Sequence, residues 1–246
     1  MANDKLEGRN PVLEGLKSGR EIDKIFVAKG AAEGSIKKII ALAKDRKIPV
    51  QQVERQKLNE ISESDNHQGV IAMVAAHEYS TVEDILEAAQ KKGKDAFILI
   101  LDEIMDPHNL GSIMRTADAV GVDGIIIPKR RAVGLTAVVA KTSAGAIEYV
   151  PVAKVSNLAQ TIDKLKKQGI WVTGADMSGE KEHYEMNLKG PIALVIGSEG
   201  EGMSRLIKEK CDFLVKLPMI GKITSLNASV AAAVLMYEVL RQRSQG

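Results

Sequence analysis

Two carboxylates stand in a glycine-rich segment that directly follows an apolar stretch near the end of this 246-residue chain. The apolar residues Ala193 to Ile196 predict a strand, and Glu199 and Glu201 lie among the glycines of the turn after it. A dinucleotide-binding loop needs the order G-x-G-x-x-G and free backbone amides for a pyrophosphate. The glycines here have the order G-x-x-G-x-G, and the two carboxylates would repel phosphate. The loop therefore suits a ligand with a cationic or neutral centre and hydroxyls, or it is a tight turn with solvated acids.

A second polar group stands where a long helix is expected to begin. Ser225 and Asn227 precede small and apolar residues that predict a helix over about 226–243, and an apolar segment ending at Pro218 comes before them. Polar groups at strand ends and helix N-termini form ligand sites in α/β proteins. Capping of the helix explains Ser225 and Asn227 equally well, so both interpretations stay open on these residues alone.

The remaining reactive residue types indicate neither a metal centre nor a disulfide. The chain has one cysteine, Cys211, and four scattered histidines without the spacing of metal ligands. No apolar run reaches the roughly 18 residues of a transmembrane helix, and the first residues are polar, unlike a signal peptide. These observations predict a cytoplasmic protein with no metal and no membrane partner.

Charge and aromatic content limit how the chain could hold a nucleic acid. The net charge is +2 and aromatic residues make up 3% of the chain, too few for a surface that grips single strands by base stacking. Contacts to nucleic acid would therefore go mainly through phosphates and shape. Among several basic clusters, Lys129, Arg130 and Arg131 follow a predicted strand and are the candidate contacts, although most such clusters are solvated surface.

Alternating strands and helices must position these residues. Apolar runs predict strands near 97–101, 124–127, 149–152, 170–174, 192–196 and 213–217, and helices are predicted near 110–120, 136–143, 157–168, 203–209 and 226–243. Strands that are apolar throughout and alternate with helices are typical of a parallel sheet covered on both faces. On the helix over 110–120, Arg115 is predicted on the side away from the apolar stripe.

The first third of the chain predicts a smaller α/β unit. Asn10 before Pro11 suits the N-cap and first turn of a helix, strands are predicted at 23–28, 49–53 and 69–75, and Ser35 can begin another helix. A helix over about 82–92 and a lysine-rich stretch follow. We therefore predict a domain over 1–76, a linker and helix over 77–94, and a second domain over 95–246.

Three motifs of the second domain resemble those of the SpoU/TrmH ribose 2′-O-methyltransferases, which belong to the SPOUT class. They read Asp106-Pro-His-Asn-Leu-Gly-x-x-x-Arg115-Thr-Ala, Ile196-Gly-Ser-Glu-Gly-Glu-Gly-Met203 and Leu217-Pro-Met-x-Gly-x-x-x-Ser225-Leu-Asn227-x-Ser229. The motifs occur in order and span most of residues 97–246. The first domain, with Gly8-Arg9-Asn10-Pro11-Val12-x-Glu14 and His67-Gln68-Gly69-Val70, resembles the L30e-like substrate-binding domain of the RlmB branch.

The resemblance implies a fold, an assembly and a cofactor. It implies an α/β protein whose C-terminal SPOUT parallel-sheet domain contains a trefoil knot, an exception to the usual absence of knots, preceded by a small L30e-like α/β domain that binds the RNA substrate. It implies a homodimer formed through the knotted domain. It also implies that S-adenosylmethionine is the cofactor and binds at Ile196, Gly197, Gly202, Leu217, Met219 and Leu226.

The same resemblance assigns roles to the polar residues. It implies catalytic positions at Asn109, Arg115, Glu199, Ser225 and Asn227, and RNA contacts at Arg9, Asn10, Lys129, Arg130 and Arg131. The reaction is methylation of the ribose 2′-hydroxyl of a guanosine in the P-loop of 23S rRNA. Arg115 would contact the phosphate beside the target; because a guanidinium carries a permanent charge, electrostatic activation of the hydroxyl is a safer role for it than that of a base.

Three other functions are weighed against this one. A tRNA ribose 2′-O-methyltransferase would use the same chemistry, but tRNA enzymes of the TrmH branch usually lack a fused domain of this kind. A non-catalytic RNA-binding ribosome-assembly factor would not need the complete set of motif residues. A nicotinamide-dependent enzyme is disfavoured by the order of the glycines.

Overall fold

The chain forms two compact units, which we describe separately. The computed structural model describes residues 5–31, 34–63 and 66–245. One unit consists of Met1–Glu78 with Gly134–Ala137, and the other of Tyr79–Val133 with Val138–Gly246. Helix α4 (Val82–Lys91), which lies at the predicted position, belongs to the second unit and begins with a capping box made by Thr81 and Asp84.

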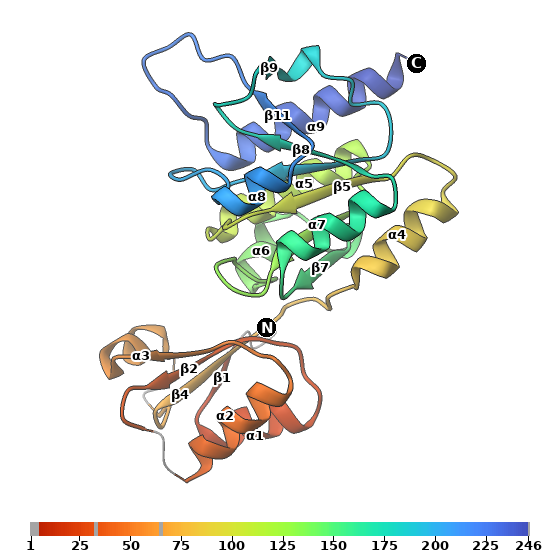
Figure 1. The fold of residues 1–246 in the computed structure, drawn as a ribbon. Coiled ribbons are helices and arrows are strands. Elements are labelled where there is room, and N and C mark those ends of the chain that lie inside the picture. The colour runs from red at the N-terminus through yellow and green to blue at the C-terminus, as the bar shows by residue number, and fades with distance from the viewer. Residues whose placement is uncertain (1–4, 32–33, 64–65, 246) are drawn as a thin grey trace. The chain divides into compact units, whose positions relative to one another are not determined.

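The first unit is a four-stranded sheet with helices on both faces (Figure 1). Its strands are β1 (Lys5–Glu7), β2 (Ile22–Ala28), β3 (Val50–Val53) and β4 (Val70–Val74), in the order β1-β4-β2-β3. Strand β4 runs antiparallel to β1 and β2, whereas β2 and β3 are parallel. Helices α1 (Arg9–Lys17) and α2 (Ser35–Asp45) bury apolar residues against one face, and α3 (Arg55–Ile61) buries Leu58 against the other.

Two details of this unit differ from the sequence predictions. Asn10 is not an N-cap, because α1 already begins at Arg9 and Gly8 occupies the capping position with a φ of 92°. A left-handed φ is readily available only to glycine, so the turn into the helix is set at Gly8 rather than by an Asn side chain. The short elements β1 and α3 were not predicted, because three and seven residues are too few for a clear periodic pattern.

The second unit contains a seven-stranded sheet in which every neighbouring pair of strands is parallel. The order is β7-β6-β5-β10-β8-β11-β9. The strands are β5 (Phe97–Leu101), β6 (Gly124–Pro128), β7 (Val152–Val155), β8 (Trp171–Ala175), β9 (Lys181–Glu182), β10 (Ile192–Ile196) and β11 (Phe213–Lys216). The prediction of an α/β protein with a parallel sheet is confirmed.

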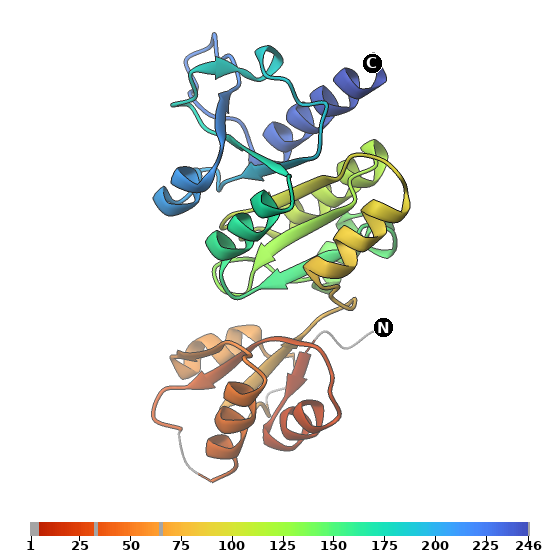
Figure 2. The ribbon, with the colours of Figure 1, turned by 45° about the vertical axis from the view of Figure 1, so that its right-hand side comes forward.

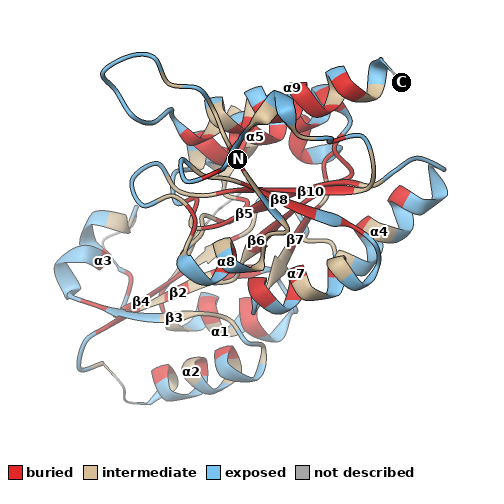
Figure 3. Ribbon diagram, turned by 45° about the horizontal axis from the view of Figure 1, so that its top comes forward, coloured by how far each residue is buried: buried red, intermediate tan, exposed pale blue. Residues whose placement is uncertain are grey.

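Helices cover both faces of this sheet (Figures 1 and 2). On one face, α4, α7 (Leu158–Lys167) and α8 (Arg205–Lys210) pack their apolar residues against the strands. On the other, α5 (Pro107–Val120) and α9 (Ala228–Ser244) pack against each other. The central strands β5 and β10 are buried along their whole length (Figure 3), which is why their sequences are continuously apolar.

Some helices and strands of this unit begin at residues other than those predicted from the sequence. The strand predicted near 149–152 is β7 at Val152–Val155, because a 3-10 turn at Ala146–Glu148 occupies the preceding residues. The last helix begins at Ala228, two residues later than predicted, and α8 begins at Arg205. The short α6 (Ala137–Thr142) lies within the predicted range. The trefoil knot implied by the resemblance stays a prediction.

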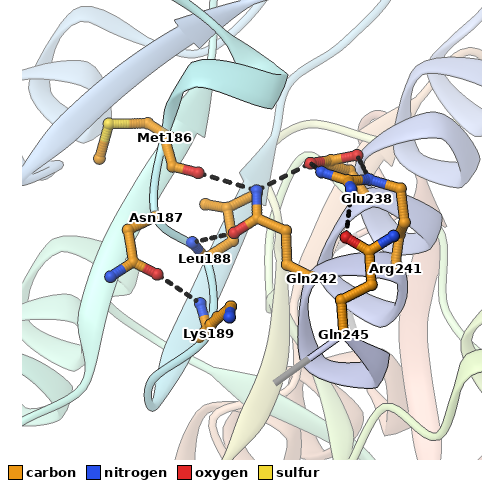
Figure 4. Close-up of polar contacts among 8 residues, drawn as sticks. All are labelled: Met186, Asn187, Leu188, Lys189, Glu238, Arg241, Gln242 and Gln245. Atoms are coloured by element: carbon orange, nitrogen blue, oxygen red, sulfur yellow. Dashed lines mark hydrogen bonds and ion pairs between the residues drawn. The ribbon is translucent and has the colours of Figure 1, made fainter.

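A buried polar cluster fixes the C-terminal half of α9 (Figure 4). The Gln242 side chain donates to the Met186 carbonyl and accepts from the Leu188 amide, both at 2.8 Å, and it also donates to Glu238. Arg241 pairs with the same Glu238 carboxylate at 2.7 Å. Because Glu238 and Gln242 are both buried, these bonds hold α9 against the segment that leads into β10. Among the described residues, no helix is long and apolar enough to cross a membrane.

Candidate active site

The loops that follow β8, β10 and β11 surround a cavity of about 280 Å³. Because these strands are parallel, their carboxyl ends meet at one edge of the sheet, where ligands bind in open α/β folds. All six residues assigned to the cofactor from the sequence line this cavity: Ile196, Gly197, Gly202, Leu217, Met219 and Leu226. Ser225 and Glu199 line it as well. The structure therefore brings the second and third motifs together in space.

The loop after β10 needs its glycines because it closes on itself. The amide of Ser198 donates to the Gly202 carbonyl and the amide of Gly202 to the Ser198 carbonyl, both at 3.0 Å. A Cβ atom on Gly197 would lie 2.2 Å from the Gly202 carbonyl carbon and the Met203 amide nitrogen. Gly202 itself has a φ of 68°. The glycine order therefore builds a tight loop whose backbone forms a cavity wall.

Asp102 holds the far end of this loop in place. It directly follows β5, is buried, and accepts a hydrogen bond of 2.8 Å from the Ser204 amide. Its own amide donates to the Ile196 carbonyl at 2.9 Å. The sequence analysis assigned Asp102 no role, because its hydrogen-bond partner lies 102 residues away in the chain.

Asn109, Glu199 and Asn227 form one hydrogen-bonded network. Asn109 Nδ2 donates to Glu199 Oε1 at 2.7 Å, and Asn227 Nδ2 donates to Asn109 Oδ1 at 2.9 Å. Asn227 Nδ2 and the Ala228 amide also donate to Glu199 Oε1. One residue from each of the three motifs meets here, so the network ties the start of α5, the loop after β10 and the start of α9 into a single unit.

The side chain of Asn227 also caps α9, which confirms the capping interpretation, and its role in a ligand site stays a prediction. Its Oδ1 accepts hydrogen bonds from the amides of Ser229 and Val230, at 3.0 and 3.3 Å. Ser225, in contrast, is exposed and makes no side-chain hydrogen bond within the described part of the chain. Asp106, which the sequence placed in the first motif, caps α5 through the amides of His108 and Asn109.

The charges around the cavity favour a cationic ligand. Its lining includes the carboxylates Asp176, Glu199 and Glu201, and none of the described lining residues is a lysine or arginine. Burial acts to raise the pKa of Asp176, but hydrogen bonds from Lys208 and Ser178 outweigh it and leave that pKa below the usual value. Lys208 Nζ lies 2.7 Å from Asp176 Oδ2. Among the described residues, Glu199 by contrast accepts hydrogen bonds only from uncharged groups and has no cationic partner.

The loop after β8 is the part of the site that the sequence prediction missed. Asp176 and Met177 line the cavity, yet the stretch from Asp176 to Glu180 carries no motif residue and the sequence analysis assigned it no role. The only available signal was its position after an apolar strand in a parallel sheet.

Arg115 does not reach the cavity of its own chain. It is exposed on α5 and does not line the cavity. Asn109, which does face the network, precedes it by six residues, or about 240° around a helix. Arg115 therefore projects from a different side of α5, as the sequence predicted, and makes no hydrogen bond or ion pair within the described residues.

The candidate RNA contacts lie at two places. Lys129, Arg130 and Arg131 follow β6, and Arg131 pairs with Glu103 at 2.8 Å, which leaves the other two without a carboxylate partner among the described residues. Arg9 and Asn10 lie in the first turn of α1 in the first unit. Arg9 Nε donates to the Gln68 carbonyl at 3.3 Å, and Asn10 is exposed.

Neither the cysteine nor a cluster of metal ligands contributes to this site within the described residues. Burial and the neighbouring Asp212 raise the pKa of the Cys211 thiol to about 12, so it is not a nucleophile at neutral pH. Within residues 5–31, 34–63 and 66–245, no group of three or more His, Cys, Asp or Glu side chains could hold a metal ion.

Comparison with known proteins places the chain in a family. Residues 96–237 match the SpoU rRNA Methylase family, and residues 5–80 match the family described as RNA 2′-O ribose methyltransferase substrate binding. The chain therefore belongs to the SpoU/TrmH family of RNA methyltransferases, and the resemblance seen in its motifs is confirmed.

Individual relatives cover nearly the whole chain. A protein of Bacillus subtilis (strain 168) named as a TrmH family tRNA/rRNA methyltransferase is 57% identical over 98% of this chain and 97% of its own length. A Staphylococcus aureus (strain MSSA476) protein of the same description is 49% identical over 99% of this chain and 98% of its own.

Solved structures agree with this assignment. The AdoMet-bound rRNA methyltransferase from Sinorhizobium meliloti is 25% identical, with a TM-score of 0.61 over 96% of this chain and 86% of that chain. The TrmH/SpoU tRNA modifying enzyme of A. aeolicus is 30% identical, with a TM-score of 0.56, but the match covers only 66% of this chain and 82% of that chain. S-adenosylmethionine is the cofactor of this family, as predicted, and the cavity, whose described lining residues include carboxylates but no lysine or arginine, fits that cation.

Proposed function

We propose that this protein methylates the ribose 2′-hydroxyl of a guanosine in the P-loop of 23S rRNA. The network of Asn109, Glu199 and Asn227 beside the acidic cavity carries the proposal, because it joins all three methyltransferase motifs at one place. S-adenosylmethionine, bound in that cavity, would supply a methyl group activated on a sulfonium.

Two observations favour rRNA over tRNA as the substrate. The rRNA methyltransferase from Sinorhizobium meliloti aligns with 96% of this chain, including the first unit, whereas the tRNA modifying enzyme covers 66%. Residues 5–80 also match a dedicated substrate-binding family. A tRNA ribose 2′-O-methyltransferase remains the second candidate, because the relatives' names include both RNA classes.

The residues of the chain have distinct tasks in this reaction. Glu199 Oε1 accepts all of the network's donors, which leaves Oε2 available to hold the substrate hydroxyl. Asn109 and Asn227 fix that carboxylate, so the hydroxyl is positioned before reaction, which lowers the entropic part of the barrier. Arg115 holds the phosphate beside the target ribose and stabilises the developing negative charge on its oxygen.

The protein acts in the cytoplasm as a homodimer formed through the second unit. On α9, Val230, Val234 and Tyr237 form an exposed apolar stripe, and their spacing places them on one side of the helix. Since exposed apolar patches of this kind mark interaction surfaces, a second copy is its partner. Arg115 then supplies its guanidinium to the cavity of the other subunit, because it does not reach its own.

A gene-deletion experiment tests the proposed substrate. Ribose methylations are mapped across rRNA and tRNA with and without the gene, and the expected result is loss of one guanosine methylation in the P-loop of 23S rRNA. Expression of the wild-type gene restores it, and an Asn109→Ala gene does not. If the only lost methylation lies in a tRNA, the second candidate is correct.

A further inference from the structure

Asp176 places an ordered carboxylate in the wall of the cavity at the ends of β8, β10 and β11. It directly follows β8, and its amide donates to the Val215 carbonyl of β11 at 2.9 Å. Its side chain is 11% exposed and belongs to the cavity lining. None of the three methyltransferase motifs contains Asp176, so the motifs give it no task, although it faces the space that would hold the cofactor.

Three donors hold this carboxylate in one orientation. Oδ1 accepts hydrogen bonds from the amide and the hydroxyl of Ser178, at 2.9 and 2.5 Å. Oδ2 pairs with Lys208 Nζ of α8 at 2.7 Å. The Gly179 amide donates to the Asp176 carbonyl at 3.0 Å and closes the turn. Because an ionised carboxylate offers about four acceptor positions, Oδ2 keeps one to which no described residue donates.

That acceptor position borders open space in the cavity. A Cβ atom on Gly202 would lie 3.8 Å from Asp176 Oδ2, and apart from the adjoining residues no other described atom lies within 4 Å of that point. Gly202 belongs to the loop after β10 and lines the same cavity. The space left by its missing side chain is therefore open to a ligand, and Oδ2 stands at its edge.

Only a hydrogen-bond donor of the cofactor can use this atom. Hydrogen bonds from Lys208 and Ser178 outweigh the effect of burial and keep the pKa of Asp176 below its usual value, so the side chain is ionised at neutral pH. An ionised carboxylate accepts hydrogen bonds and donates none. S-adenosylmethionine carries donors at three places: the amino group of adenine, the ribose hydroxyls and the ammonium of the methionine part.

The charge balance around Asp176 favours the ribose hydroxyls. Lys208 already neutralises this carboxylate, so an ammonium gains less there than beside Glu201, which lines the cavity without a cationic partner among the described residues. An uncharged hydroxyl can bind Oδ2 and leave the ion pair intact. The flat adenine suits the apolar side chains of the lining, such as Ile196 and Leu217. A carboxylate also binds ribose hydroxyls in the parallel sheets of dinucleotide-binding folds.

We propose that Asp176 Oδ2 accepts a hydrogen bond from a ribose hydroxyl of S-adenosylmethionine. Lys208 and Ser178 act through Asp176 as positioning residues, because they fix the carboxylate before the cofactor binds and so reduce the entropy lost on binding. Asp176 then selects for the nucleoside part of the cofactor. This inference rests on the proposed function, which places the cofactor in this cavity.

The first test measures binding of S-adenosylhomocysteine by calorimetry. Asp176→Asn keeps the size of the side chain but removes its charge and one acceptor oxygen, so the ligand should bind about tenfold more weakly than to the wild type. The control is Glu180→Gln, the same change at an exposed residue of the same loop that does not line the cavity. Its affinity should equal that of the wild type, and equal affinities for all three proteins would overturn the inference.

Ligand analogues identify the group that Asp176 holds. The wild type and Asp176→Asn are titrated with the 2′-deoxy and 3′-deoxy forms of S-adenosylhomocysteine and with a form that lacks the amino group. For at least one deoxy form the two proteins should bind alike, whereas the loss should stay about tenfold for the form without the amino group. If the loss disappears only for that last ligand, Asp176 binds the ammonium and the proposal is wrong. An equal loss for every ligand would mean that the substitution only disturbs the cavity, which would also overturn the proposal.

Lys208→Met tests the positioning role. S-adenosylhomocysteine should bind roughly twofold to fivefold more weakly, the scale of one partly exposed ion pair, while the deoxy form that ignores Asp176→Asn should bind as it does to the wild type. Lys208→Arg keeps the charge and should restore the affinity. Lys210→Met is the control, because Lys210 lies on the same helix, pairs with Asp163 and does not line the cavity. If Lys208→Met weakens both ligands equally, the positioning role is wrong.

Failure of this inference can be told apart from failure of the proposed function. If the wild-type protein binds S-adenosylhomocysteine but methylates no RNA, the proposed function fails, and the assignment of Asp176 stands on the binding measurements. If the wild-type protein does not bind S-adenosylhomocysteine, the inference fails with the placement of the cofactor. If it binds the ligand and methylates RNA while Asp176→Asn binds every ligand as the wild type does, only the assignment of Asp176 fails.

Discussion

Asn227 performs two tasks that require different ends of one side chain. Its Oδ1 caps α9, and its Nδ2 donates to Asn109 and Glu199. Serine or aspartate could provide a capping oxygen, but an aspartate has no donor for a neighbouring carboxylate. The asparagine is therefore explained by the site as well as by the helix.

Asn227→Asp separates the two tasks. The cap remains, so the free energy of unfolding should fall by less than in Asn227→Ala, which should lose about 0.5–2 kcal/mol with the cap. In the aspartate variant two carboxylates face each other, so the loop after β10 should be displaced and methyl transfer should fall by at least roughly tenfold. Chemical unfolding and single-turnover methylation provide the measurements. Equal unfolding free energies for the two variants would contradict the capping assignment.

Arg115 should affect turnover and not cofactor binding. It lies outside the cavity that would hold the cofactor and has no partner within the described residues, so Arg115→Ala should leave the affinity for S-adenosylhomocysteine unchanged. Turnover should fall by roughly 10² or more, the scale for one key electrostatic group. Lysine should rescue poorly because it lacks the planar fork. Asp118→Asn, also exposed on α5, serves as the control, and a matching loss there would argue against a specific role for Arg115.

At the scale of elements, a glycine without a functional side chain is explained by the close approach of two helices. Gly111, within the first motif, faces the end of α6: a Cβ atom there would lie 1.9 Å from Thr142 Oγ1 and 3.0 Å from the Ser143 amide nitrogen. This contact sets the position of α5, and with it the place of Asn109 in the network.

Gly111→Ala should therefore destabilise the protein by roughly 1–3 kcal/mol, the usual cost of overpacking. The control is Gly190→Ala, because a Cβ there meets nothing within 4 Å and the residue is not among those with positive φ. Urea unfolding of both variants is compared with the wild type. If both substitutions lower the free energy of unfolding by the same amount, the close packing of α5 on α6 is not the reason for a glycine at position 111.

Sequence alone predicted the elements whose patterns are local. Strands β5 and β10 were recognisable because they are buried on both faces, and the six cavity residues because the second and third motifs contain them. Long-range contacts were not recognisable: the bond from Ser204 to Asp102 and the position of Asp176 in the cavity depend on how distant loops meet. Asn10 was misassigned because a capping side chain is a weaker determinant than a glycine with positive φ, and Gly8 precedes it.

At the scale of the whole molecule, α9 is apolar on more than one side. Its buried side includes Leu235, Met236 and Val239 and packs within the subunit, while Val230, Val234 and Tyr237 remain exposed. A helix that is apolar all round is normally buried on all sides. The exposed stripe therefore needs a partner surface, which agrees with the proposed homodimer.

Val234→Lys should disrupt this dimer. A charged side chain in the centre of the stripe would be buried without a partner, and that penalty should shift the protein toward monomer. Leu206→Lys is the control, since Leu206 is an exposed apolar residue on α8. Light scattering after size exclusion gives the mass of each variant at several concentrations. A dimeric Val234→Lys protein would place the interface elsewhere.

The last prediction concerns whether one active site draws on two chains. Arg115 projects from α5 away from the network that holds Asn227, so a complete site would combine Arg115 of one subunit with Asn227 of the other. Arg115→Ala and Asn227→Ala homodimers should each be nearly inactive. In a heterodimer of the two variants, one of the two sites then has both residues intact, and activity should return to roughly half of the wild-type value, as expected when sites act independently. Differently tagged subunits allow the heterodimer to be purified before assay. If purified heterodimers stay inactive, both residues act within one subunit, and Arg115 must reach its own cavity through a movement of α5.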